Sequence, residues 1–261
     1  MATLITIQGA DFSANSVGFI APVTTGLLGW WWLGGSVAET QQDRAGIANA
    51  TLSGSPTIAA GYVSFGGFSS GQYLTTNVTE VDAMTLLVVA RSTEGAHSST
   101  DLPMFVSNYG TDAGNGGVPI GASIYVSAGT VPAGTIRLGA GQNNNGTKQG
   151  QITTTFSTST ATSWNFYAGT LADTSEVTST TGNARILYNM TTDQSNETSN
   201  YPRVSHSANK MRIGAGYSSS FSGSCDVAFA AFYSGVLTEA QITTIYDSVK
   251  ARLAALHSIT I

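Results

Sequence analysis

Pairs of acidic side chains are the first residues in this chain whose types and spacing suggest chemistry. Hydrolysis of a glycosidic bond needs two carboxyl groups held about 5 to 9 Å apart. The nearest pairs in the sequence are Glu80 with Asp82 and Glu94 with Asp101. Both pairs fall in or beside expected loops rather than in the middle of a strand. We therefore interpret them as solvated turn acids and expect no catalytic residues.

Histidine, serine and cysteine give no catalytic pattern either. His97, His206 and His257 lie far apart and lack the spacing of metal ligands. Sequence distance alone leaves a Ser-His-Asp triad open, but no G-x-S-x-G turn is present to hold its serine. A zinc site would need a Cys/His cluster, and the single cysteine, Cys225, lies in an apolar run typical of a buried hydrophobe. The sequence thus predicts a protein that is not an enzyme.

A glycine-rich stretch at 108–117, NYGTDAGNGG, leaves one metal question open. Asp112 and Asn115 offer the hard oxygen ligands that calcium prefers, together with backbone carbonyls. One carboxylate is few for a tight site, so a plain glycine-rich loop is the competing interpretation. No other cofactor is expected.

Amide side chains gather in the stretch GQNNNGTKQG at 141–150. Gln142, Asn143, Asn144 and Asn145 can each donate and accept hydrogen bonds, which suits sugar hydroxyls. Asn145 followed by glycine is also a strong hairpin-turn signal. The stretch is therefore either a carbohydrate-binding loop or an ordinary turn between two strands.

Three of the four tryptophans stand side by side in GWWWLGG at 29–35. A strand points successive side chains to opposite faces, so Trp30 and Trp32 share one face and Trp31 takes the other. A tryptophan side chain on the outer face of a strand exposes a large apolar surface, which is usually covered by another part of the protein or by a ligand. The segment 9–25 with Phe12 and Phe19, an adjacent subunit or a stacked sugar would each provide such a cover. We favour burial against protein, so Phe12, Phe19 and Trp31 are predicted oligomer-interface residues, and Trp31→Ala is expected to disturb assembly more than folding.

Composition narrows the classes of function. The chain has 261 residues, 41% hydrophobic but only 10% charged, with 30 glycines and a net charge of −5. Nucleic-acid binding needs a basic stripe, which is absent from the sequence. No run of 18 apolar residues or basic-then-apolar leader occurs, so we expect no membrane insertion and no secretory signal.

Periodicity predicts an all-β fold with one helix. Strand signals separated by glycine, asparagine and serine recur at roughly ten-residue spacing, as in a sandwich or barrel. The runs at 84–91 and 225–233 are almost continuously apolar, as expected for strands buried on both faces. A helix is predicted over 238–256, capped by Thr238 and Gln241 in a T-x-x-Q capping box. Its apolar face follows helical spacing and comprises Ile242, Ile245, Tyr246, Val249 and Leu253.

The order of motifs resembles that of a known fold family. The opening at 30–76, WWWLGGSVAETQQDRAGIANATLSGSPTIAAGYVSFGGFSSGQYLTT, places a D-x-x-G turn at 43–46 after the tryptophan strand. The close at 211–246, MRIGAGYSSSFSGSCDVAFAAFYSGVLTEAQITTIY, has a long apolar strand before an L-T-x-x-Q-I helix. Together they resemble concanavalin A-like (laminin G-like) jelly-roll domains. The resemblance implies an antiparallel jelly-roll β-sandwich from about Leu27 to Leu256.

The same resemblance leaves several functions open, since this fold serves lectins, glycosidases, adhesion modules and viral proteins. The E-x-D-x-E triad of its glycosidases is absent, and Phe229 or its neighbours replace an acid often found in the penultimate strand. The opening segment GADFSANSVGFIAPV resembles openings of phage tail and other virion proteins.

We therefore expect an N-terminal strand and attachment segment at 1–26 and a jelly-roll domain at 27–261. The function predicted is that of a non-enzymatic bacteriophage virion component, tail-associated and adhesive, that binds host-surface carbohydrate. Its partners would be other virion proteins and further copies of itself, in a homo-oligomer with three-fold symmetry. The alternatives are a purely structural capsid-decoration or baseplate protein and a polysaccharide-degrading enzyme.

Overall fold

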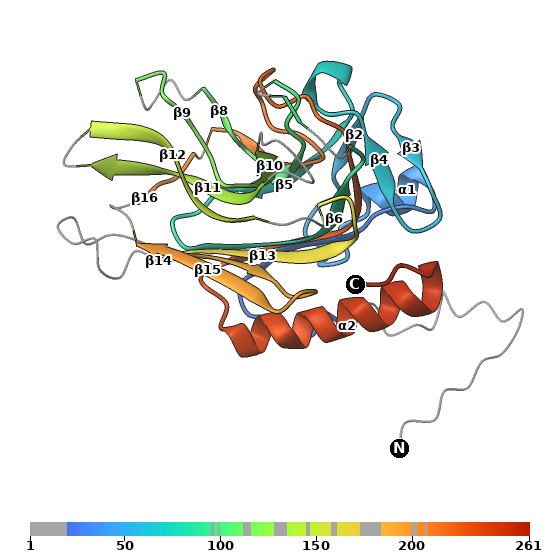
Figure 1. The fold of residues 1–261 in the computed structure, drawn as a ribbon. Helices are drawn as coiled ribbons and strands as arrows, with labels where there is room; N and C mark the ends of the chain where they lie inside the picture. Colours follow the sequence, from blue (N-terminus) through green and yellow to red (C-terminus); the bar gives the residue numbers. More distant parts are fainter. Residues whose placement is uncertain are drawn as a thin grey trace, which may run out of the picture.

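Two antiparallel β-sheets face each other, and one long helix lies on the outer side of the first sheet (Figure 1). The computed structural model describes residues 20–94, 97–98, 100–111, 116–127, 135–144, 147–157, 161–172, 184–199, 203–206 and 208–261. The prediction of an all-β antiparallel sandwich with a C-terminal helix is confirmed.

The first sheet has eight strands in the order β15-β14-β13-β6-β18-β4-β3, with β1 also pairing with β18. All its pairings are antiparallel. The strands are β1 (Leu27–Trp32), β3 (Thr57–Ile58), β4 (Val63–Phe65), β6 (Met84–Ser92), β13 (Asn165–Leu171), β14 (Ala184–Asn189), β15 (Gln194–Ser199) and β18 (Cys225–Ser234).

The second sheet has eight strands in the order β12-β11-β10-β7-β17-β5-β2, with β16 also pairing with β11. It is antiparallel as well. The strands are β2 (Thr51–Ser53), β5 (Tyr73–Thr79), β7 (Met104–Ser107), β10 (Ser123–Ser127), β11 (Thr135–Asn144), β12 (Thr147–Ser157), β16 (Arg203–Val204) and β17 (Lys210–Ile213). A small ribbon of β8 (Gly110–Thr111) and β9 (Pro119–Ile120) stands apart from both sheets.

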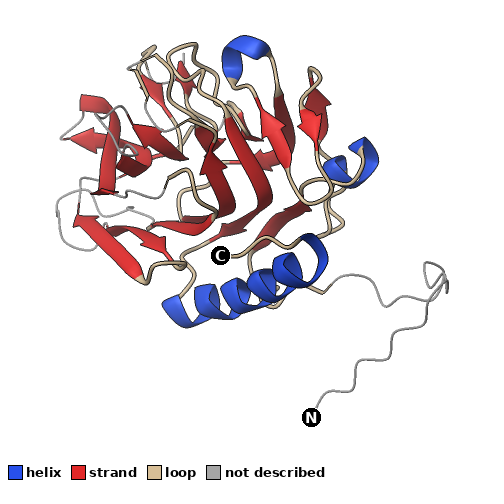
Figure 2. Cartoon of the chain, turned by 45° about the vertical axis from the view of Figure 1, so that its right-hand side comes forward, coloured by secondary structure: helices blue, strands red, loops and turns tan. Residues whose placement is uncertain are grey.

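Helical residues lie at the periphery of the β-structure (Figure 2). They form α1 (Val37–Gln41), the 3-10 turn η1 (Phe68–Ser70) and α2 (Glu239–His257). The capping box predicted for α2 is confirmed, since Gln241 N donates to Thr238 Oγ1 at 3.3 Å and Thr238 N donates to Gln241 Oε1 at 2.9 Å. The five apolar side chains predicted for its inner face are all buried.

The first sheet carries apolar side chains on both of its faces. One face meets the second sheet in a core that includes Phe232, and the other packs under α2 in a second core that includes Phe229. Strands β6 and β18 are therefore buried on both sides, as their continuous apolar runs predict. Cys225 is fully buried, and burial raises the pKa of its thiol.

The tryptophan strand β1 supplies both cores. Trp30 and Trp32 point under α2, where their rings lie 4.7 Å and 5.0 Å from that of Phe229. Trp31 points between the sheets, is 1% exposed and lies 5.9 Å from Phe232. A Cβ at Gly29 would stand 2.2 Å from the Trp31 ring, so this position must be glycine.

The prediction that Trp31 lies at an oligomer interface is thus wrong. The alternation of β1 was correctly expected, but α2 and the second sheet cover its two faces within one chain. Phe12 and Phe19 lie outside the described residues, as do residues 1–19 of the segment expected at 1–26. The division between residues 26 and 27 stays a prediction.

We expect Trp31→Ala to destabilise the fold by about 3–5 kcal/mol, because it empties a large volume between two sheets that cannot collapse together. Urea unfolding of the two proteins measures the difference. Leu256→Ala is the control, since Leu256 is 59% exposed and its removal should cost less than about 0.5 kcal/mol. A normal unfolding midpoint for Trp31→Ala combined with a changed oligomeric state would contradict this placement.

Candidate functional site

The amide stretch proposed for carbohydrate lies largely inside a strand. Gln142, Asn143 and Asn144 are the last residues of β11, and Asn145 lies outside the described residues. Gln142 pairs with Arg203 of β16 and is 4% exposed. The expectation of a binding loop is therefore corrected for Gln142, which is buried in β11 and paired with the short strand β16 that the sequence did not reveal. The calcium hypothesis concerns Asp112 and Asn115, which lie outside the described residues, so it stays a prediction.

Glu80 is buried and not a solvated turn acid, which corrects the sequence interpretation. It follows β5 directly, is 3% exposed and forms an ion pair with Arg203. Its Oε2 accepts hydrogen bonds from Asn108 Nδ2 at 2.7 Å, Ala122 N at 3.1 Å and His206 N at 3.0 Å. One carboxylate thus joins segments next to β5, β7, β10 and β16. This network is structural, because it is buried and joins segments that are far apart in the sequence.

Arg185 lies close to the same network, on β14. Its guanidinium donates to the backbone oxygens of Ala140 at 3.4 Å and Gly141 at 3.1 Å. Burial and the neighbouring positive charge of Arg203 lower its pKa to about 10, against the opposing effect of Glu80. Arg185 remains charged at neutral pH and ties the two sheets together.

Glu94, His97 and Asp101 come together at one turn although no metal-ligand spacing marks them in the sequence. Their ligand atoms lie within 4.8 Å of one another. Both ring nitrogens of His97 already have partners: Nε2 lies 2.8 Å from Ser92 Oγ and Nδ1 lies 2.9 Å from the Asp101 carbonyl oxygen. Both contacts go to residues of the same turn, so the histidine serves the turn.

This turn also contains a serine and two acids, which are the parts of a hydrolase. The Ser92 side chain is 1% exposed, so a substrate cannot reach its hydroxyl. The ligand atoms of Glu94 and Asp101 lie within 4.8 Å of each other, and Asp101 contributes to the raised pKa of Glu94. Retaining glycosidases hold their two carboxyls about 5 Å apart, so the assay for released reducing ends includes this pair.

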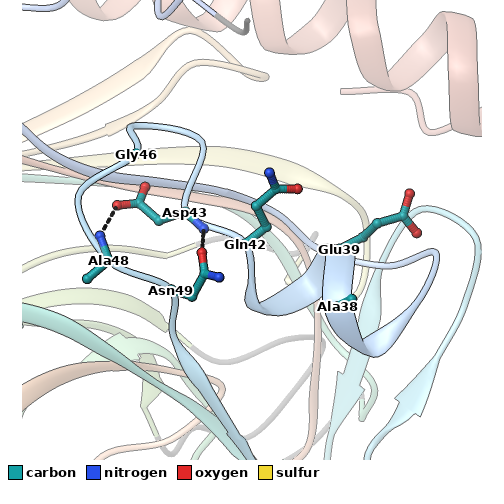
Figure 3. A pocket seen from close by; sticks show the side chains of 7 residues that line it. All are labelled: Ala38, Glu39, Gln42, Asp43, Gly46, Ala48 and Asn49. Atoms are coloured by element: carbon teal, nitrogen blue, oxygen red, sulfur yellow. Dashed lines mark hydrogen bonds between the residues drawn. The ribbon is translucent and has the colours of Figure 1, made fainter. Parts of the chain in front are cut away.

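Asp43 explains the D-x-x-G turn seen in the sequence. Its Oδ1 accepts from Trp30 N and Ala45 N, both at 2.9 Å, and its Oδ2 accepts from Ile47 N at 3.1 Å and Ala48 N at 3.3 Å. Figure 3 shows this turn, with Gly46 among the residues that form it. The turn borders a surface hollow of about 590 Å³. Gly46 has a φ of +76°, which favours glycine. Asp43 therefore fixes the turn against the tryptophan strand.

The outer face of the second sheet holds the group of side chains best suited to binding. We call it the aromatic–arginine face and define it by Tyr73, Tyr109, Tyr125, Arg137, Arg212, Tyr217 and Phe221. Strand alternation creates it, because the intervening residues Leu74, Ile124, Ile136, Leu138 and Ile213 all point into the core.

Stacked rings and guanidinium groups build this face. The Arg212 guanidinium carbon lies 3.8 Å from the ring centre of Tyr73 and 3.5 Å from that of Tyr217. The Phe221 ring stands edge-on to those of Tyr109 and Tyr125, at 5.2 Å and 5.4 Å. The loops that carry Tyr109 and Tyr217 are joined by a backbone hydrogen bond of 2.8 Å. The face is therefore preorganised.

Three tyrosines of this face, Tyr109, Tyr125 and Tyr217, stay neutral at physiological pH. Burial raises the pKa values of Tyr109, Tyr125 and Tyr217 above the ordinary value, and Arg137 and Arg212 only partly oppose that shift at Tyr125 and Tyr217. A neutral phenol both donates and accepts hydrogen bonds. Tyr73, Tyr109, Tyr217 and Phe221 are partly exposed, whereas Tyr125 is buried beneath them at 5% exposure. Such a surface can stack on and hydrogen-bond an uncharged polar ligand. The sequence did not reveal it, because its members are spread over four strands and two loops.

Comparisons with known proteins identify the fold. No protein-family model and no curated protein sequence matches the chain. Among solved structures, the receptor binding domain of botulinum neurotoxin D matches with a TM-score of 0.57 and 12% identity, over 88% of this chain and 54% of that chain. The serotype D ligand binding domain in complex with N-acetylneuraminic acid matches with a TM-score of 0.54 and 11% identity, over 87% of this chain and 52% of that chain.

A third match is the binding domain of botulinum neurotoxin DC in complex with SialylT, with a TM-score of 0.56 and 12% identity, over 87% of this chain and 52% of that chain. This chain thus spans about half the length of the chains it matches. At these identities the likeness concerns the fold alone. The concanavalin A-like and bacteriophage resemblances stay predictions. No helix within the described ranges is long and apolar enough to cross a bilayer.

We expect Glu80→Gln to destabilise the protein by about 3–5 kcal/mol, because it leaves the buried guanidinium of Arg203 without its counter-charge. Denaturant unfolding measures the loss, with Glu197→Gln on the exposed strand β15 as the control. Adding Arg203→Met to Glu80→Gln should restore part of the loss, since the orphaned charge is gone. Equal stability of the Glu80→Gln and Glu197→Gln proteins would contradict the network.

Asp101→Asn should lower the pKa of Glu94. That pKa lies above its ordinary value because of burial first, and then because of the hydrogen bond and the negative charge of Asp101. The folded state therefore favours protonated Glu94, and the associated stability is lost as pH rises through the raised pKa. Carboxyl-carbon NMR titration should show the shift and Asp101→Asn should reduce it. An unchanged Glu94 titration would show that the two carboxyls do not interact.

Proposed function

We propose that this protein is a non-enzymatic attachment module that binds host-surface carbohydrate, and that it works in a bacteriophage virion, associated with the tail. The observation that carries the proposal is the aromatic–arginine face. Two features support it: the fold is shared with receptor-binding domains, and two of those domains are described in complex with sugars. The opening segment's resemblance to virion proteins supports the location.

The chemistry of the face fits a neutral or weakly charged sugar. Tyrosine rings offer flat apolar faces to the C–H side of a pyranose, while phenol and guanidinium groups form hydrogen bonds with its hydroxyls. The rings and Arg212 hold each other in place, so little side-chain entropy is lost on binding. None of the seven defining side chains is a carboxylate. The face is therefore equipped to bind and not to hydrolyse.

A shallow face of this kind gives weak single contacts. Several copies presented together convert weak binding into strong attachment through effective concentration. We therefore propose a homo-oligomer with three-fold symmetry, held to other virion proteins through the segment at 1–26. The second sheet suits such display, because its outer face carries no helix in the described part of the chain.

A glycan array probed with the assembled protein tests the function. Tyr217→Ala should weaken binding of the best glycan by about ten-fold or more, since losing a stacking ring removes about 1 kcal/mol at each of several linked sites. Tyr62→Ala is the matched control: Tyr62 is also half-buried and also stacks with an arginine, Arg91, but lies outside the aromatic–arginine face. It should bind like the unaltered protein.

Other outcomes would assign other functions. Silence across bacterial surface polysaccharides, with the protein located on a virion by electron microscopy, would indicate a purely structural component. Release of reducing ends from a polysaccharide, abolished by Asp101→Asn, would indicate an enzyme. Binding that Tyr217→Ala and Tyr62→Ala change equally would remove the aromatic–arginine face from the proposal.

A further inference from the structure

A second hollow lies on the opposite side of the molecule, where the end of β1 meets the last turns of α2. Its volume is about 350 Å³, within the range of about 300–1,000 Å³ typical of small-ligand sites. The residues that line it include Trp32, the Gly34–Gly35 turn, Glu39, Arg44, Arg252 and His257. We call it the Arg44–Arg252 pocket. It shares no residue with the aromatic–arginine face.

Positive charge in this pocket lacks a protein counter-charge. The ion pairs among the described residues are Arg91 with Asp226 and Arg203 with Glu80, so neither Arg44 nor Arg252 has one. Arg44 Nε and His257 Nδ1 are buried and have no hydrogen-bond partner. Arg44 is also close enough to Arg252 to lower its pKa, after the larger effect of burial. The guanidinium groups of Arg44 and Arg252 repel each other, and Arg44 Nε has an N–H group without a partner. An anion bound between them would relieve the repulsion and accept that hydrogen bond.

The pocket is held in shape by the surrounding fold. The Arg252 guanidinium carbon lies 4.7 Å from the Trp32 ring centre, which fixes its plane. Asp43 anchors the turn that carries Arg44. A Cβ at Gly61 would lie 2.4 Å from the Cβ of His257, so only glycine lets the backbone at position 61 pack against the His257 side chain. The donors are thus positioned before any ligand arrives.

We propose that the Arg44–Arg252 pocket binds the carboxylate of an acidic sugar residue in the host polysaccharide, an inference that rests on the proposed function. Guanidinium groups bind a carboxylate through two parallel hydrogen bonds. Glu39, which lines the pocket and whose Oε2 accepts from Ser36 Oγ at 2.9 Å, can accept from sugar hydroxyls but repels a dianion. This favours a singly charged carboxylate over a phosphate. Exposed Leu256 at the rim offers an apolar contact for the sugar ring.

Isothermal titration of the full chain with sodium glucuronate tests the assignment, with methyl glucoside as the neutral probe and inorganic phosphate as the other oxyanion. Glucuronate should bind, and Arg44→Gln and Arg252→Gln should each weaken it by about ten-fold or more. Arg252→Lys should weaken it less, since the charge remains while the second hydrogen bond is lost. Lys250→Gln removes a charge from the same end of α2 and should leave binding unchanged. Thermal melts verify that each variant is folded.

Three results would overturn the inference: no heat with glucuronate, equal binding of methyl glucoside, or phosphate binding as tight as that of glucuronate. Glucuronate binding that survives both arginine-to-glutamine changes would overturn it too. The glycan array distinguishes failure of the Arg44–Arg252 pocket assignment from failure of the proposed attachment function. Glycan binding that depends on Tyr217 but not on Arg252 would leave the attachment function standing without the acidic-sugar pocket. An array that is silent for all variants would remove both.

Discussion

The two apolar faces of the first sheet are the constraint on which the rest of the structure depends. Strands β1, β6 and β18 carry large hydrophobic side chains in both directions, so neither face of that sheet can meet water. The second sheet covers one face, and α2 covers the other. At about 25 cal/mol per Å² of buried apolar surface, burial of three adjacent tryptophans is a large part of the driving force for closing both layers. The outer face of the second sheet is then left to present polar and aromatic side chains.

Few charges are available in this chain, and the structure uses several of them inside. Asp43 and Glu80 each accept several hydrogen bonds from main-chain or side-chain N–H groups, which offsets the cost of removing a carboxylate from water. Asp43 fixes the turn that carries Arg44, and Glu80 joins segments beside four strands of the second sheet. Both carboxylates thus act at the base of a surface: one below the Arg44–Arg252 pocket, the other within the layer that bears the aromatic–arginine face.

These two surfaces differ in chemistry. The aromatic–arginine face is broad, with Arg212 already stacked on Tyr73 and Tyr217, and it suits hydroxyl-rich ligands. The Arg44–Arg252 pocket is small and has positive charge without a partner, and it suits one anionic group. They lie on opposite layers of the sandwich, so an extended polysaccharide or two neighbouring chains could engage both without competition.

Local patterns determined the parts of this protein that depend on local physics. The helix α2, its capping box and its buried face follow from residues within one or two turns of each other, and the buried strands β6 and β18 follow from uninterrupted apolar runs. The strand β15, QSNETS, has no apolar alternation because most of its side chains are exposed, so only pairing with β14 reveals it. The burial of Trp31 and the ion pair of Glu80 were decided by tertiary structure. Their partners come from distant segments, 123 residues away for Glu80 and Arg203, and nothing in the sequence states which segments meet.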